Sequence, residues 1–229
     1  TTSATILSLV IFRLTGLNID GIVGIGVALV VMWAGVGIAK DTLEPLIGEA
    51  IDPEEYDKVG EDVWIAKSAN VFPSAYVHGP AIIGKDAEVR HCAFIRGNAL
   101  VGEGCVVGNS TELKNVILFN KVQVPHYNYV GDSVLGYKSH MGAGSITSNV
   151  KSDKTLVTVK TPKGAIETGL KKFGAMLGDE VEVGCGSVLN PGTVVGSHTN
   201  IYPLSMVREF VPAGSIYKKR GEVIEKYEK

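Results

Sequence analysis

Residues 81–110 read AIIGKDAEVRHCAFIRGNALVGEGCVVGNS, in which an aliphatic residue returns at every sixth position. Most of these residues are followed, four positions later, by a small side chain. The same spacing extends in both directions, through Ile65, Val71, Val77, Ile83, Val89, Ile95, Val101, Val107, Leu113 and Phe119. It slips near His126 and returns with Leu135, Met141, Leu177, Val183, Leu189, Val195, Ile201 and Val207. A six-residue repeat predicts a parallel β-helix, in which three hexapeptides complete one coil.

The repeat predicts an all-β domain over residues 63–217, with the aliphatic residues stacked inside and the small ones at tight corners. Such solenoids need capped ends, and the polar, helix-like stretch 43–62 is expected to cap the first coil. The charged tail 218–229 is expected to end in a short helix. The period breaks between 150 and 172, where LVTVK, Pro-Lys-Gly and AIE predict a hairpin that lies over a binding face or embraces a neighbouring subunit.

Residues 1–51 follow different rules. The eighteen residues 22–39 carry no charge, which is the lower limit for a membrane-spanning helix. We therefore predict an apolar helical hairpin joined by a linker, 52–62, to the β-helix; a buried hairpin in a soluble protein is the alternative. This segment resembles the last transmembrane helix and exit linker of cation diffusion facilitator transporters. The metal-binding domain of that family does not follow, so a cation-efflux function is disfavoured.

The composition narrows the classes of function. A formal net charge of -2 and 7% aromatic residues do not support nucleic-acid binding. Three cysteines without paired spacing predict buried thiols in a reducing compartment. The five histidines show no spacing typical of a zinc site, so no metal is expected.

The stretch VPHYNYVGD, residues 124–132, holds the first candidate catalytic residue. His126 stands where the repeat is disturbed, so its side chain is not expected in the aliphatic stack. A histidine titrates near neutral pH, as a general base must. A histidine that merely completes a turn is the alternative at this point.

The run IRGNALVGEGCVVGNSTELKNVILFNKVQVPHYNYVGDSVLGYKSHMGAGSITSN, residues 95–149, resembles the acetyltransferase domain of bifunctional UDP-N-acetylglucosamine pyrophosphorylases. The resemblance extends over about residues 63–219. It implies a left-handed β-helix, a homotrimer with active sites between subunits, and acetyl-CoA as the acetyl donor. The acceptor is expected to be an amino-sugar phosphate or a nucleotide sugar.

The resemblance also assigns site residues. His126 matches the general base and Asn149 a sugar-binding asparagine of the catalytic set. The residues that match substrate contacts are Arg96, Lys114, Tyr129 and Lys172. The residues that match the acetyl-CoA channel, or that would meet its phosphates, are Gly184, Cys185, Met206, Val207, Lys218 and Lys219, with Arg220 beside them.

Several departures from the family leave the function open. Val150 and Lys151 replace a tyrosine and an aspartate, His140 replaces a sugar-binding asparagine, and the insertion 150–172 is foreign to the family. A non-catalytic β-helix that binds a sugar nucleotide and promotes trimerisation, as in nucleotidyltransferase-like proteins, is therefore the alternative. We expect a cytoplasmic protein, held at the cytoplasmic face of the membrane if residues 1–40 insert.

Overall fold

The computed structural model describes residues 13, 25–26, 28–33, 51–219 and 222–225. The chain divides into two compact units, residues 1–51 and 52–229. In the first unit residues 28–33 are helical, and no helix among the described residues is long and apolar enough to cross a membrane. Most of the predicted span 22–39 and of the predicted hairpin 1–51 lies outside the described residues, so the structure gives the membrane prediction no support.

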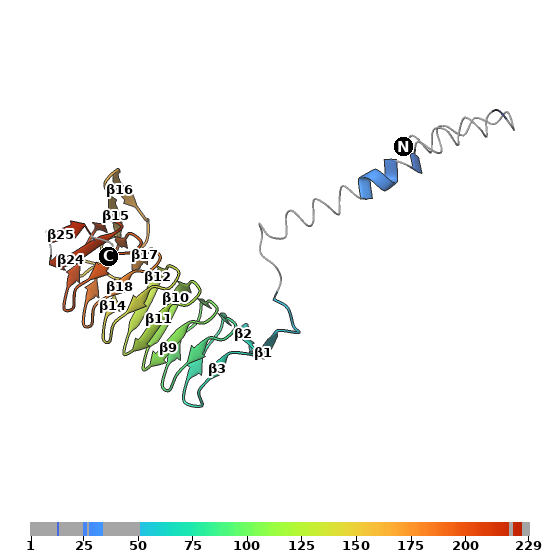
Figure 1. The fold of residues 1–229 in the computed structure, drawn as a ribbon, viewed down its shortest axis with the longest axis horizontal. Coiled ribbons are helices and arrows are strands. Elements are labelled where there is room, and N and C mark those ends of the chain that lie inside the picture. Colours follow the sequence, from blue (N-terminus) through green and yellow to red (C-terminus); the bar gives the residue numbers. More distant parts are fainter. Residues whose placement is uncertain (1–12, 14–24, 27, 34–50, 220–221, 226–229) are drawn as a thin grey trace. The chain divides into compact units, whose positions relative to one another are not determined.

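The second unit is the parallel β-helix that the six-residue period predicts (Figure 1). Its strands form three faces. The first face contains β2 (Val63–Ala66), β5 (Ala81–Ile83), β8 (Ala99–Val101), β17 (Ala175–Leu177), β20 (Thr193–Val195) and β23 (Phe210–Val211). The second contains β4 (Tyr76–Val77), β7 (Phe94–Ile95), β14 (Ile146–Thr147), β19 (Val188–Leu189) and β22 (Met206–Val207).

The third face contains β3 (Asn70–Val71), β6 (Glu88–Val89), β9 (Val106–Asn109), β11 (Gln123–His126), β13 (His140–Met141), β18 (Glu182–Val183), β21 (Asn200–Ile201) and β24 (Ser215–Lys219). Two longer strands, β10 (Glu112–Leu118) and β12 (Tyr129–Leu135), turn the corner between the second face and the first. The first part of β10 pairs with β7 and its last part with β8.

Inside the prism the aliphatic residues stack as predicted. Ile83, Ile95, Val107 and Leu113 are fully buried, and the small residues at the corners, such as Thr111, are buried with them. Each buried residue packs against the equivalent residue of the coils above and below. The apolar contacts therefore form one continuous core.

The prediction that Phe119 points inward is wrong. Its side chain is 53% exposed, while Leu118 is buried and pairs with Val101 in the coil below. Along β10 the inward positions Leu113 and Leu118 are five residues apart instead of six. The same shortening recurs along β12 between Val130 and Leu135, so the slip lies in these two strands and not at His126.

Where the structure describes the two ends of the solenoid, strands replace the expected helices; residues 43–50 and 226–229 of those stretches lie outside the described residues. Tyr56–Gly60 forms β1, which runs antiparallel to β2. At the other end Glu222–Glu225 forms β25, which runs antiparallel to β24. Because the outermost strands would otherwise expose unpaired backbone groups, an added antiparallel strand satisfies hydrogen bonds that a helix would leave open.

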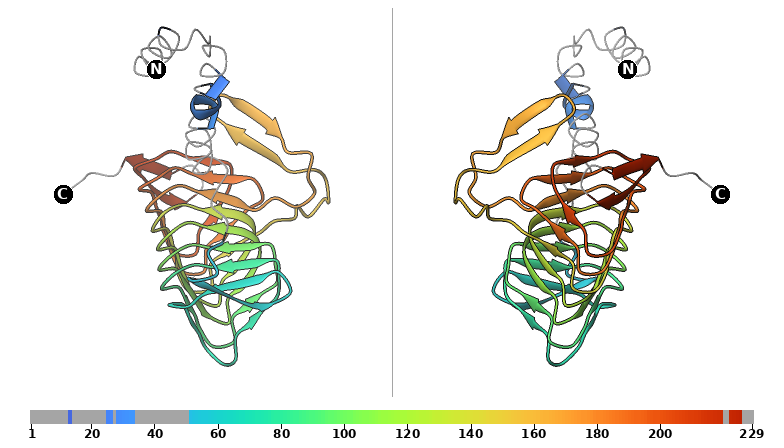
Figure 2. Two further views of the ribbon diagram at one scale, coloured as in Figure 1. Left: turned by 90° about the vertical axis from the view of Figure 1, so that its right-hand side faces the viewer. Right: turned by 90° about the vertical axis from the view of Figure 1, so that its left-hand side faces the viewer.

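The predicted hairpin between residues 150 and 172 is present. β15 (Thr158–Thr161) pairs antiparallel with β16 (Gly164–Glu167), and Figure 2 shows the two strands standing out from one end of the solenoid. The base is fixed to the coils, because Val157 is fully buried and Val159 is 8% exposed. We call residues 150–172 the excursion.

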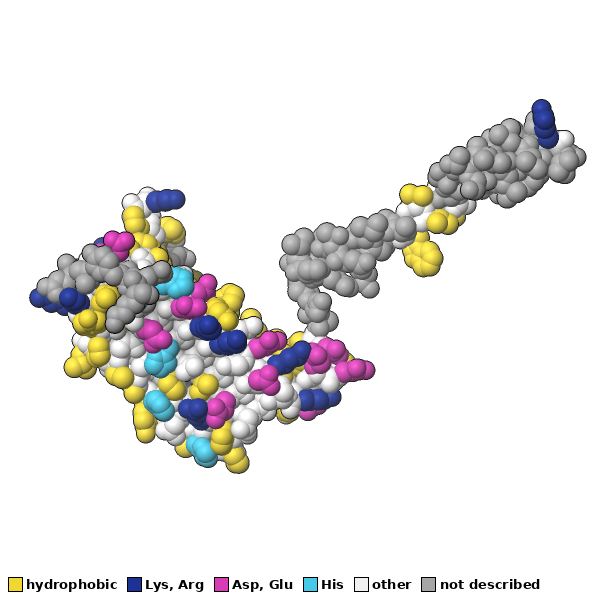
Figure 3. Space-filling model, in the orientation of Figure 1, with side chains coloured by type: hydrophobic (Ala, Val, Ile, Leu, Met, Phe, Trp, Pro, Cys, Tyr) yellow, Lys and Arg dark blue, Asp and Glu magenta, His cyan; other side chains and the backbone are white. Residues whose placement is uncertain are grey.

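The outer surfaces of the faces differ in polarity. On the third face the outward positions are mostly polar or charged, and Figure 3 shows charged side chains of both signs and histidines across the molecule. On the first face the outward positions form one row, here called the apolar stripe. It consists of Trp64, Ile82, Leu100, Ile117, Val134, Met176, Val194 and Phe210.

The expectation of buried thiols holds for one cysteine. Cys105 is buried, whereas Cys92 and Cys185 are exposed, and all three are free. Burial raises the pKa of Cys105 to about 11, and its thiol donates a hydrogen bond to the carbonyl of Phe119 at 3.0 Å.

We expect Leu113→Ala to lower the free energy of unfolding by about 2–5 kcal/mol, because it removes a fully buried side chain and leaves a cavity. Leu204→Ala is the matched control, since that leucine is 85% exposed and should change stability by less than about 0.5 kcal/mol. Urea unfolding of the two variants measures the difference. Equal loss of stability would show that Leu113 does not belong to the continuous core.

Candidate functional site

His126 lies at the corner between the third face and the second. It ends β11, and its side chain is exposed. The turn that presents it is held by the buried Asn128, whose side-chain oxygen accepts a hydrogen bond from the His126 N–H at 3.1 Å. The amide nitrogen of Asn128 donates to the carbonyls of Gly142 and Ser145 in the next coil. The core thus fixes the backbone that carries the imidazole.

Tyr129 follows this turn and brings the predicted Asn149 into the same cluster. Asn149 Nδ2 donates to Tyr129 Oη at 3.2 Å and to a carboxylate oxygen of Asp132. The tyrosine lies over Gly131, where an added Cβ would come within 2.6 Å of its hydroxyl. Burial raises the pKa of Tyr129, and the hydrogen bond from Asn149 opposes that rise. The hydroxyl is therefore neutral at physiological pH and can both donate and accept hydrogen bonds.

Asp132 belongs to a ladder of amides along the corner between the second face and the first. Asn98 Nδ2 donates to Asn115 Oδ1 at 2.8 Å, and Asn115 Nδ2 donates to Asp132 Oδ1 at 2.7 Å. Asn98, Asn115 and Asp132 all have positive φ angles of about 50°, which asparagine and aspartate tolerate better than other residues with a Cβ. We call Asn98, Asn115, Asp132 and Asn149 the amide ladder.

The sequence analysis did not identify Asp132 and Asn128 as site residues, although the sequence contains a signal for each. The ladder residues recur every 17 residues, at 98, 115, 132 and 149, which equals the length of the shortened coils. Asn128 occupies a position where other coils carry a small residue such as Thr111 or Ser145.

Arg96 and Lys114 lie on the outer side of the second face, one position after the buried Ile95 and Leu113. Arg96 Nη1 contacts Glu112 Oε1 at 2.6 Å, and this hydrogen bond is the main reason that the pKa of Arg96 is raised. The anion beside Arg96 in this structure is thus the Glu112 carboxylate, and the two side chains are 40% and 34% exposed.

The residues matched to the acetyl-CoA channel follow the His126 corner through successive coils. The carbonyl of His126 accepts from Gly144 N–H at 3.0 Å, and that of Cys185 accepts from Leu204 N–H at 2.9 Å. Gly184 and Cys185 come at the end of β18, and Lys218 follows Tyr217, which pairs with Ile201. The structure therefore places the predicted base and the predicted channel along one edge of the solenoid.

The other residues that the resemblance assigns to the site lie farther apart in the structure. Met206 is 49% exposed on the second face, whereas Val207 is fully buried, so that only its backbone could face a ligand. Lys219 is exposed on β24, and Arg220 lies outside the described residues. Lys172 is exposed at the end of the excursion, where its backbone forms a bridge with Val150.

His140 lies on the third face. Its Nδ1 is 2.8 Å from Glu182 Oε2, so it is engaged away from the Tyr129 cluster. Within the described part of the chain, no group of three or more His, Cys, Asp and Glu side chains is arranged to hold a metal ion.

These features define a β-helix of hexapeptide repeats with a polar cluster beside one corner. The GMPPB C-terminal domain family matches residues 77–202, which is more than half of the 229-residue chain. The chain belongs to this family. The match agrees with the hexapeptide-repeat class that the sequence resemblance implies.

Three curated relatives are similar in sequence to this chain. The chain is 37% identical over 122 residues to the bifunctional protein GlmU of Methanococcus vannielii, covering 53% of this chain and 29% of the relative. It is 33% identical over 112 residues to a bifunctional sugar-1-phosphate nucleotidylyltransferase/acetyltransferase of Sulfurisphaera tokodaii, covering 49% and 28%. It is 32% identical over 168 residues to the uncharacterized acetyltransferase YaiX of Escherichia coli O6:K15:H31, covering 73% of each chain. The match to the two bifunctional proteins thus spans less than a third of their length.

We expect Asp132→Ala to lower the free energy of unfolding by about 1–3 kcal/mol, because Asn115 and Asn149 both lose an acceptor. Asp132→Asn should cost less, since asparagine tolerates the positive φ angle and keeps one acceptor oxygen. Chemical denaturation of both variants measures the difference. If the alanine variant were as stable as the parent, the ladder would not hold Asn149 in place.

Proposed function

We propose that the chain transfers an acetyl group from acetyl-CoA to the amine of an amino-sugar phosphate or a nucleotide sugar. The observation that carries this proposal is the arrangement of an exposed His126 beside the hydrogen-bonded pair Tyr129 and Asn149. Membership of a family with acetyltransferase relatives supports it. Two of the relatives are named as acetyltransferases, and the name of one also refers to a sugar 1-phosphate. These names support a sugar derivative as the acetyl acceptor.

In the proposed reaction His126 acts as the general base. Its neutral imidazole accepts a proton as the sugar amine attacks the thioester carbon of acetyl-CoA. The tetrahedral intermediate then collapses, its C–S bond breaks, and the imidazolium returns the proton to the departing thiolate. The products are the N-acetylated sugar and CoA. A positioned base of this kind contributes about 10²–10⁴-fold to a rate.

The other residues would hold the two substrates. Tyr129 and Asn149 offer a hydroxyl and an amide to the sugar, and their geometry is fixed in advance by Asp132. If the acceptor is a sugar monophosphate, Arg96 and Lys114 would bind its phosphate, with Arg96 exchanging its contact to Glu112 for the ligand. The corner with Gly184, Cys185 and Met206 would receive acetyl-CoA, and the exposed Lys218 and Lys219 lie at the end of the same edge.

The active form is proposed to be a homotrimer. The apolar stripe runs through eight successive coils of the first face, and Leu100 and Ile117 within it are 46% and 40% exposed. The other six residues of the stripe are partly exposed. A continuous row of apolar side chains that keep contact with solvent supports packing against a protein partner. A second and a third copy of this chain would cover it and bring a neighbouring solenoid beside the His126 corner.

We expect His126→Ala to reduce thiol release from acetyl-CoA by about 10²–10⁴-fold in the presence of an acceptor amino sugar. The fold should persist, because the imidazole is exposed. His126→Gln should be similarly impaired, since an amide cannot accept the proton. A thiol-release assay with a panel of amino-sugar phosphates and nucleotide sugars provides the measurement.

His140→Ala is the control for this assay, because His140 pairs with Glu182 on another face and should leave the rate unchanged. Equal rates for the parent and His126→Ala would refute the assignment of the base. If the parent binds a nucleotide sugar but releases no thiol with any acceptor, the non-catalytic binding and trimerisation module becomes the better description.

We expect light scattering to give the mass of a trimer, and Leu100→Glu combined with Ile117→Glu to give a monomer. Two carboxylates in the stripe would have to be desolvated on association, which costs several kcal/mol each. Gln123→Glu places the same charge on an exposed side chain of the third face, away from the stripe, and should leave the trimer intact. A monomeric parent would count against both the trimer and a site shared between subunits.

A further inference from the structure

The excursion and the last coils line a hollow beside the candidate site. Its volume is about 540 Å³, and the polar residues that line it include Ser148, Lys151, Asp153, Lys160, Asn190 and Arg208. A cavity of this size suits a small-molecule ligand. Ser148 and Val150 both line it and flank Asn149 in the sequence, so the hollow begins where the amide ladder ends.

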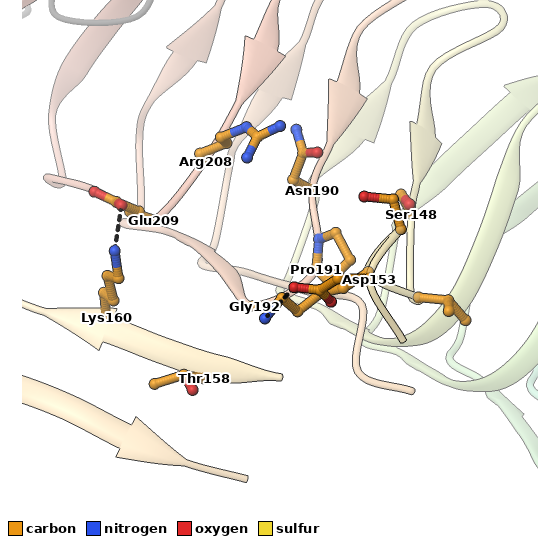
Figure 4. Close-up of a pocket in the computed structure, with 12 residues that line it drawn as sticks. Ser148, Asp153, Thr158, Lys160, Asn190, Pro191, Gly192, Arg208 and Glu209 are labelled. Carbon is orange, nitrogen blue, oxygen red and sulfur yellow. Dashed lines mark hydrogen bonds and ion pairs between the residues drawn. The ribbon is translucent and has the colours of Figure 1, made fainter. Parts of the chain in front are cut away.

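One wall consists of three polar residues in equivalent positions of successive coils. Ser148, Asn190 and Arg208 each follow an inward residue, and those inward residues, Thr147, Leu189 and Val207, pair in register. Adjacent strands lie about 4.8 Å apart, so the wall presents a hydroxyl, an amide and a guanidinium at that spacing. Figure 4 shows the Arg208 side chain directed toward Asn190.

The carboxylates of the hollow are already engaged with other groups. Lys160 Nζ is 2.8 Å from Glu209 Oε1, and Lys151 Nζ is 3.5 Å from Asp153 Oδ2. Asp153 also accepts hydrogen bonds from the N–H and the hydroxyl of Thr155. These contacts leave three cations and two carboxylates in the lining, and therefore one excess positive charge.

Arg208 carries that excess charge. Among the described residues no carboxylate lies within ion-pair distance of its guanidinium, which contacts the sulfur of Met206 at 3.9 Å. Asn190 Nδ2 donates to the carbonyl of Val207 at 2.9 Å, which leaves its second N–H for a ligand. A guanidinium beside N–H and O–H donors matches the geometry of phosphate oxygens, to which arginine binds bidentately.

We propose that this hollow binds the diphosphate of a nucleoside diphosphate group on the acetyl acceptor. Arg208 contacts the phosphate oxygens, Asn190 and Ser148 donate hydrogen bonds, and Lys151 supplies a second charge from the excursion. The inference rests on the proposed function and narrows it, because it selects a nucleotide sugar over a sugar monophosphate. The sugar would extend from the hollow toward Asn149 and Tyr129.

CoA also carries a diphosphate, but its proposed channel follows the opposite corner of the second face, with Gly184 and Cys185. The hollow adjoins Asn149 instead, on the acceptor side. The buried Val157 and Val159 hold the base of the excursion against the coils, so the wall that Lys151 and Lys160 contribute exists before a ligand arrives.

Calorimetric titration of the full chain with UDP, GDP and CoA, each alone, tests the proposal. We expect at least one nucleoside diphosphate to bind, and Arg208→Gln to weaken that binding by about 10- to 100-fold, the usual effect of losing a charged hydrogen-bonding partner. Lys151→Gln should weaken it in the same direction. Lys163→Gln, at the exposed turn of the same hairpin, should bind like the parent, and thermal unfolding verifies that each variant is folded.

The proposal is overturned if neither nucleoside diphosphate binds, if Arg208→Gln binds like the parent, or if CoA affinity alone responds to the substitution. Thiol release by the parent tests the proposed function separately. If the parent transfers acetyl groups and Arg208→Gln binds nucleoside diphosphates like the parent, the hollow is not the diphosphate site, but the proposed acetyltransferase function stands. If Arg208→Gln loses UDP or GDP binding while the parent releases no thiol, the diphosphate site in the hollow stands and the proposed acetyltransferase function is rejected.

Discussion

The stacking of equivalent side chains in successive coils is the contact on which everything else in this solenoid depends. Residues such as Leu113 and Val130 lie one above the other because their strands pair in register, and each is fully buried. Because the core is repetitive, every outward position is also repeated in register. An outward side chain on one coil therefore lies beside the side chains at the equivalent position of the neighbouring coils, so a repeat in the sequence produces a continuous row on the surface.

The shortened coils show the functional consequence of this rule. Val107 pairs with Val124, and Leu118 with Leu135, at separations of 17 residues, whereas Val89 and Val107 are 18 apart. The shorter separation aligns Asn98, Asn115, Asp132 and Asn149 at one corner. The ladder in turn holds Tyr129 over Gly131, so the geometry of the polar cluster follows from coil length as much as from the identity of its residues.

The six-residue period predicted the class of fold, because burial of an aliphatic residue depends on its own position in the repeat. The period predicted the wrong orientation for Phe119, because the strand before it is one residue shorter than the repeat and no residue type in the sequence indicates that shortening. The polar, helix-like composition of the two ends also misled the prediction, because β1 and β25 form by pairing with the strand edge that each covers. For the candidate site, the resemblance proposed His126, Tyr129 and Asn149, and the structure joins Tyr129 and Asn149 by a hydrogen bond. The sequence analysis did not select Asp132 or Arg208. The contacts of Asp132 and the place of Arg208 in the hollow depend on residues that lie a whole coil or more away in the sequence.

The excursion leaves the solenoid after Asn149 and returns without disturbing the stack. Leu135 pairs with Leu177, 42 residues later, in the same register as the shorter coils. A coil of this kind can thus gain chain length at a corner while the residues above and below keep their partners. Variation in length at that corner can alter what the surface recognises, while the opposite corner, with His126, stays unchanged. Under the roles proposed for the excursion in recognition and for His126 in catalysis, the two functions occupy separate corners, so one can change while the other keeps its geometry.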